Sequence, residues 1–187
     1  THRHSSAASD VYKRQAGTLL PLNQIVNLDK DSLASFKKYI SERQVSRLGV
    51  VGSSEITAET IEKSFKRFLS LLEKHFSIFP FLLGKRPASA DFAMFGQLSQ
   101  LVGFDPTSRK IAHEISPRTV AWVSLMEDLS GLEVSDQDWI LDEVPESLSN
   151  IFKEIGKVYA PALLANKEAT LKDEKTWKAL ILSLIHI

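Results

Sequence analysis

Apolar residues recur at helical spacing in several stretches of the chain, with polar residues between them. The clearest stretch runs from Thr57 to Phe76. Its apolar face carries Ile61, Phe65, Phe68, Leu69, Leu72 and Phe76. Charged residues such as Lys63 and Glu73 fall on the opposite face. This period of about 3.6 residues predicts an amphipathic helix over residues 57–76.

Four further stretches have the same pattern together with start or stop signals. They cover residues 31–48, 89–102, 116–131 and 145–159. Asp29, Asp31 or Ser32 can cap the first of these helices, and Ser116-Pro117 supplies a cap and a first-turn proline for the third. Pro161 is expected to kink or interrupt the last one. No segment alternates with period two for long enough to predict a strand, so the predicted fold is all-α, a helical bundle with short loops.

Composition and charge narrow the classes of function. A chain of 187 residues with 43% hydrophobic and 25% charged residues is typical of one soluble globular domain. The 23 basic and 23 acidic residues create no net field, and no Lys/Arg cluster stands out, so we expect no nucleic-acid partner. The chain has no cysteine, which excludes disulfides and thiolate zinc sites within it and fits a cytoplasmic location.

The two ends of the chain are predicted to be foreign to the domain. DVYKRQ, residues 10–15, and LSLIHI, residues 182–187, can be encoded by DNA strings that are reverse complements of each other. Those strings look like the transposase adapters used in sequencing libraries, so residues 1–15 and 182–187 are interpreted as translated adapter. The apolar tail from Trp177 is also shorter than the about 20 residues that span a bilayer, so no membrane anchor is expected.

The stretch FLLGKRPASADFAMFGQL, residues 81–98, carries a family resemblance. It resembles the start of the buried helix in the C-terminal domain of glutathione S-transferases, where a hydroxyl residue precedes an Ala-Asp pair and caps the helix. Here Ala88 stands at the position of that hydroxyl, three residues before Asp91. Either the cap shifts to Ser89, or Asp91 acts without its hydroxyl partner.

The likeness extends over nearly all of residues 31–166. Its further segments are RQVSRLGVVGS (43–53), DPTS (105–108), SPRTVAWVSLMEDLSGLE (116–133) and IGKVYAPALLAN (155–166). The resemblance implies a helical bundle of the glutathione S-transferase C-terminal type over residues 31–181. Residues 16–30 would then be a linker or the end of a missing thioredoxin-like domain.

The resemblance also implies a function. Proteins of this family transfer glutathione to small electrophilic substrates, and the thioredoxin-like domain binds glutathione and supplies the residue that promotes the thiolate. The helical domain lines the electrophile pocket and, through its first two helices, supports a homodimer. The chain alone would therefore be inactive even if the parent is an enzyme. A non-catalytic binding or assembly module is the alternative, because fold does not settle function.

Three residues are predicted to bind substrate. Arg43 and Arg47 lie four apart on the first helix, so both could face a cleft and attract an anionic cosubstrate, although a solvated basic edge is the favoured interpretation. Trp122, like Phe95, is either a core residue or one wall of an apolar pocket.

No catalytic residue or metal site is predicted. His75 and His113 lack a second ligand at suitable spacing, so both are interpreted as packing or surface residues. The acidic residues around Trp139 lack the glycine and spacing of a calcium loop. GVVGSSE, residues 49–55, has no following lysine and no preceding strand, so it is interpreted as an interhelical loop rather than a phosphate loop.

Overall fold

The protein is all-α. The computed structural model describes residues 17–51, 53–140, 142–175, 180–181 and 185–186. Residues 17–24 are helical, and the elements after them are α2 (Lys30–Ser46), η1 (Leu48–Val51), α3 (Ala58–Phe76), α4 (Ser89–Leu98), η2 (Ser99–Phe104), α5 (Pro106–Ile115), α6 (Pro117–Glu127), η3 (Asp136–Asp138), α7 (Glu146–Val158), α8 (Ala160–Leu171), β1 (Leu180–Ile181) and β2 (Ile185–His186). In the described residues, the antiparallel pair β1 and β2 is the only sheet.

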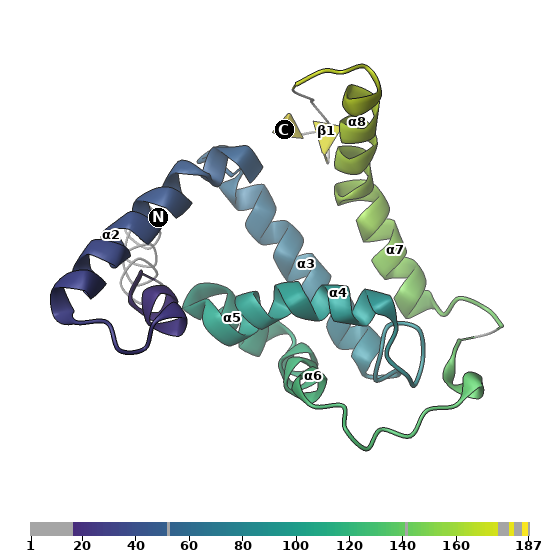
Figure 1. Ribbon diagram of the computed structural model, residues 1–187. Coiled ribbons are helices and arrows are strands. Elements are labelled where there is room, and N and C mark those ends of the chain that lie inside the picture. Colours follow the sequence, from purple (N-terminus) through teal and green to yellow (C-terminus); the bar gives the residue numbers. More distant parts are fainter. Residues whose placement is uncertain (1–16, 52, 141, 176–179, 182–184, 187) are drawn as a thin grey trace.

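Helix α3 is the central element of the fold. Its apolar face packs against α5, α6 and α7, and Leu69 and Leu72 in the middle of that face are fully buried. Figure 1 shows α2 on one side of α3 and the α7–α8 arm on the other. The opposite face of α3 is solvated and carries Glu59–Lys63 and Glu62–Lys66 ion pairs at i,i+4 spacing. The predicted amphipathic helix over residues 57–76 is therefore confirmed.

Helix α2 lies beside the N-terminal helical segment. The Asp29 side chain caps α2 by accepting the N–H groups of Asp31 and Ser32, each at 3.0 Å. Lys37 Nζ of α2 donates to Thr18 Oγ1 at 3.2 Å. Asp29 is thus the cap among the three residues that the sequence offered.

The region after α4 differs from the prediction. The helix expected over residues 89–102 ends as an α-helix at Leu98 and continues as the π-helical turn η2. Helix α5 was not predicted, although Asp105 caps it by accepting the N–H groups of Thr107 and Ser108 at 2.8 and 2.9 Å. Pro106 occupies its first turn, where the missing N–H costs nothing.

The connection between α6 and α7 contradicts the expectation of short loops. Helix α6 ends at Glu127, before the predicted stop at Gly131, and α7 begins only at Glu146. Two backbone bonds tie this connection to the turn after α3: Lys85 N donates to Asp138 O at 2.7 Å, and Ile140 N donates to Leu83 O at 2.9 Å. These bonds anchor the connection at residues 138 and 140, and among its described residues η3 is the only helical turn.

Pro161 separates α7 from α8, as the sequence predicted. Helix α7 ends at Val158, and Pro161 lies in the first turn of α8. Proline is tolerated there because the first N–H groups of a helix have no acceptor within it.

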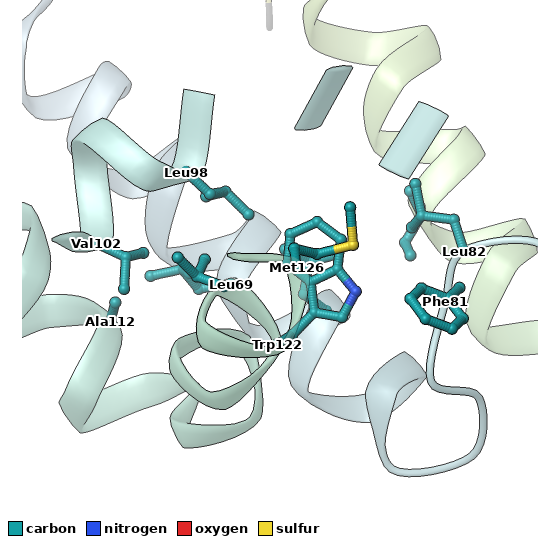
Figure 2. Packing of buried hydrophobic residues seen from close by; sticks show 11 residues of the cluster. Leu69, Phe81, Leu82, Leu98, Val102, Ala112, Trp122 and Met126 are labelled. Carbon is teal, nitrogen blue, oxygen red and sulfur yellow. The ribbon is translucent and has the colours of Figure 1, made fainter. Parts of the chain in front are cut away.

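The hydrophobic core lies among the elements from α3 to α7. Figure 2 shows Leu69 between Val102 and Ala112 on one side and Trp122 and Met126 on the other. Phe81 and Leu82 extend the same cluster toward the turn that precedes α4. The helices that the sequence places far apart therefore share one continuous core.

In the described part of the chain, no helix combines the length and the apolar character needed to cross a bilayer.

Gly84 is predicted to be indispensable for the link between the turn and the α6–α7 connection. Its φ is +136°, and a Cβ at this position would lie 2.0 Å from Asp138 O. Gly84→Ala should lower the free energy of unfolding, measured by urea titration, by more than about 1 kcal/mol, because the backbone at Asp138 or at residue 84 would have to move to admit the Cβ. Gly96→Ala in α4 is the matched control: its Cβ meets nothing within 4 Å, and the change should be neutral or stabilising.

Candidate functional site

A pocket of about 290 Å³ opens between the C-terminal end of α3 and one face of α6. Its lining residues are Phe76, Pro80, Arg118, Ala121, Trp122 and Leu125. Five of these side chains are apolar, and Arg118 is the one that carries a charge. A mostly apolar pocket with one charged group is typical of small-molecule sites.

Two of the lining side chains are stacked aromatic rings. Phe76 of α3 and Trp122 of α6 lie with ring centroids 5.2 Å apart and planes inclined by 14°. Trp122 is nearly buried, and within the described residues its Nε1 has no hydrogen-bond acceptor. In Figure 2 this nitrogen points toward Phe81 and Leu82. Trp122 therefore serves the core and one wall of the pocket together.

A polar network fixes the start of α6 at the edge of the pocket. Ser116 Oγ and Arg118 N each donate to Glu73 Oε2 at 3.0 Å, and Arg118 Nη1 donates to Glu73 Oε1. Burial alone would raise the pKa of Glu73, but the bonds from Arg118 and Ser116 outweigh it and hold that pKa below its usual value. The carboxylate is thus ionised at neutral pH and locks α6 to α3.

Arg43 and Arg47 lie away from this pocket. Both are exposed, near the C-terminal end of α2. Helix α2 packs against η1, and Figure 1 places it on the far side of α3 from α7. The structure therefore does not bring these arginines together with Trp122.

The turn before α4 is organised by a buried carboxylate. Asp91 is fully buried, and its Oδ2 accepts the Ala88 N–H while its Oδ1 accepts the Leu82 N–H, both at 2.9 Å. Ala88 is the N-cap of α4 and makes no side-chain cap bond, and Ser89 is the first helical residue. Of the two arrangements considered from the sequence, Asp91 acting without a hydroxyl partner is the one present.

His75 lies beside this carboxylate and is also fully buried. Its Nε2 is 3.2 Å from Phe81 O, and its Nδ1 is 2.9 Å from Ser147 Oγ. Because a carbonyl oxygen only accepts, Nε2 carries the hydrogen, and Nδ1 of the neutral ring accepts from the Ser147 hydroxyl. His75 is therefore a packing residue that links α3 to the turn and to α7.

The two buried groups have shifted pKa values. Burial lowers the pKa of His75, although the Phe81 carbonyl and the charge of Asp91 oppose that shift. Burial raises the pKa of Asp91, against the N–H groups of Leu82 and Ala88.

The remaining sequence candidates are accounted for by structure. His113 is exposed on α5. Asp138 Oδ2 caps η3 by accepting the Ser135 N–H at 2.6 Å, and Asp136 pairs with Arg86, whose guanidinium lies 4.8 Å from the centre of the Trp139 ring. Within the described ranges, no group of three or more potential ligands could hold a metal ion.

The segment GVVGSSE contains the end of a short helical turn. Residues Leu48–Val51 form the 3₁₀ turn η1, and Ser54 and Thr57 then bond to each other before α3 starts. No strand precedes the segment among the described residues, so it lacks the context of a phosphate loop.

A second, larger groove lies between α3 and α7. It measures about 310 Å³ and is lined by Ser64, Phe65, Phe68, Glu154, Ile155 and Tyr159. Arg67 donates twice to Glu154 Oε1, at 2.8 and 3.0 Å, and so joins the two helices beside it. This groove could not be predicted from the sequence, because its walls are two helices about ninety residues apart in the chain.

Comparisons with known proteins give no relative. No family model matches the chain, and no curated protein or solved structure matches it. The resemblance to glutathione S-transferases therefore remains a prediction from the sequence.

Asp91→Asn tests the buried carboxylate. Asparagine keeps one acceptor but turns an amide N–H₂ toward a backbone donor, so the free energy of unfolding should fall by about 2–3 kcal/mol in urea titration. Asp105→Asn is the matched control, since Asp105 caps α5 near the surface and asparagine caps equally well. Equal effects of the two changes would contradict the role of Asp91.

His75 should make stability depend on pH. Its folded pKa lies below the ordinary value of 6.5, so the unfolded chain binds the proton more tightly and stability falls as the pH drops below that value. The pKa of Asp91 is raised above its ordinary value of 3.8, so the folded state binds this proton more tightly than the unfolded chain. Between 3.8 and the raised pKa, the contribution of Asp91 to stability therefore grows as the pH drops, opposite to that of His75.

The measurement is urea unfolding between about pH 7.5 and pH 5.5, the range around the ordinary pKa of a histidine. His75→Gln keeps an N–H donor for the Phe81 carbonyl but does not titrate, so the loss of stability should become shallower by at most about 1.4 kcal/mol per pH unit. An unchanged slope in His75→Gln would refute the assignment.

Proposed function

We propose that residues 31–181 are the C-terminal helical domain of a glutathione S-transferase family protein. In that role the domain lines the electrophile pocket of an enzyme that transfers glutathione to small electrophilic substrates. The observation that carries the proposal is the 81–98 stretch, which resembles the family motif and in which the buried Asp91 ties the preceding turn to the start of α4.

The chemistry divides between two domains on this proposal. The transferase reaction needs a glutathione thiolate stabilised by hydrogen bonds and an apolar pocket beside it. The pocket lined by Phe76, Trp122 and Leu125 would be that apolar pocket. The residues that bind the glutathione cosubstrate and stabilise its thiolate belong to a thioredoxin-like domain encoded upstream. This chain alone is therefore inactive.

A homodimer in a cytoplasmic setting completes the proposal. The family resemblance assigns the dimer contact to α2 and α3. Tyr39 and Val45 on α2 and Ile61 on α3 are large apolar residues that stay exposed, which supports a partner on these helices.

A non-catalytic binding or assembly module is the second candidate. The observation that favours it is the lining of the Trp122 pocket, where Arg118 is the one ionisable side chain and no other lining residue could act as nucleophile or base. Such a module would bind a ligand or partner without transforming it.

The intact gene provides the test. Sequencing across the region upstream of Ala16 from unfragmented DNA should reveal a thioredoxin-like domain with a Tyr, Ser or Cys placed to activate the thiol. The intact protein should then conjugate glutathione to a chloro-dinitrobenzene, whereas the present chain should show no retention on immobilised glutathione. An upstream domain without the activating residue would favour the binding module, and retention of the chain itself would contradict the division of chemistry.

A further inference from the structure

Arg118 is held in place with part of its guanidinium unused. Its Nη1 and its backbone N–H both bond to Glu73, whereas Nε and Nη2 meet no acceptor in the described part of the chain. The side chain is 54% exposed, so these donors are accessible. Guanidinium groups bind carboxylates through such adjacent N–H groups.

The apolar wall next to Arg118 determines what else a ligand needs. Phe76, Trp122 and Leu125 supply aromatic and aliphatic surface in the same pocket. At about 290 Å³, the pocket lies near the lower end of the roughly 300–1,000 Å³ typical of ligand sites. We propose that this pocket binds a small aryl carboxylate, with its ring against the apolar wall and its carboxylate on Nε and Nη2 of Arg118.

Glu73 does not prevent this binding. Both of its oxygens already accept bonds, from Ser116 Oγ, Arg118 N and Arg118 Nη1. The Glu73 carboxylate therefore orients the Arg118 guanidinium before a ligand binds, which reduces the entropy cost of ordering the arginine side chain on binding. A ligand ammonium has no acceptor side chain among the lining residues and would face the charge of Arg118.

The inference specifies the substrate class of the proposed transferase pocket, and in that sense it rests on the proposed function. Binding of the carboxylate can nevertheless be measured on the present chain without glutathione. Loss of one proposal therefore leaves the other testable: absence of an upstream thioredoxin-like domain removes the transferase, and absence of carboxylate binding removes only the substrate class.

The experiment is calorimetric titration of the full chain with naphthoate, with its neutral amide naphthamide, and with naphthylmethylamine. Naphthoate should bind at least about tenfold more tightly than naphthamide, because a hydrogen bond to a charged group contributes more than a neutral one. Naphthylmethylamine should bind more weakly than both. Equal affinity for the acid and the amide, a preference for the amine, or no detectable naphthoate binding would overturn the proposal.

Two variants locate the site. Arg118→Gln should remove the preference for the acid, while Arg43→Gln, a matched change of an exposed arginine on α2, should keep it. Because loss of Arg118 also releases Glu73, a second pair avoids that contact: Leu125→Glu places a like charge in the pocket, and Leu164→Glu places one on α8 outside it. Leu125→Glu should weaken naphthoate at least about tenfold relative to Leu164→Glu. An equal preference for the acid in Arg118→Gln and Arg43→Gln, or an equal affinity for naphthoate in Leu125→Glu and Leu164→Glu, would also overturn the proposal.

Discussion

The fold depends on one buried carboxylate. Asp91 has no exposed surface, and its two oxygens are occupied by the N–H groups of Leu82 and Ala88. These bonds hold the turn after α3 against the start of α4 and satisfy backbone donors that would otherwise be buried without partners. His75 continues the network through the carbonyl of Phe81 to Ser147 of α7. A charge that is costly to bury thus joins three helices.

Periodicity was sufficient for helices whose apolar faces are long, and insufficient elsewhere. Helix α3 was predictable because its apolar positions persist over five turns. Helix α5 was missed because ten residues offer few apolar positions, although Asp105-Pro106 carried a cap and first-turn proline that could have revealed it. The α6–α7 connection depends on contacts distant in sequence, such as that of Lys85 with Asp138, which no local pattern encodes.

The candidate site was predictable to a smaller extent. Trp122 was identified as a core or pocket residue, and in the structure it belongs to the core cluster and also lines the pocket, where its ring stacks on Phe76. Arg118 was overlooked because its importance comes from Glu73, which lies 45 residues earlier in the chain. Spacing along one helix favoured Arg43 and Arg47 instead, and spacing cannot show which face of α2 meets another element.

The β-bridge between Gly84 and Trp139 divides the α6–α7 connection into two parts that differ in how freely their length can change during evolution. Residues 136–140 lie against the turn after α3, where the Asp138 carbonyl occupies the space that a side chain at position 84 would need. Residues 129–135 precede the bridge and are mostly exposed. Insertions and deletions among homologues should therefore accumulate in residues 129–135, while the length of 136–140 stays constant and glycine stays at 84.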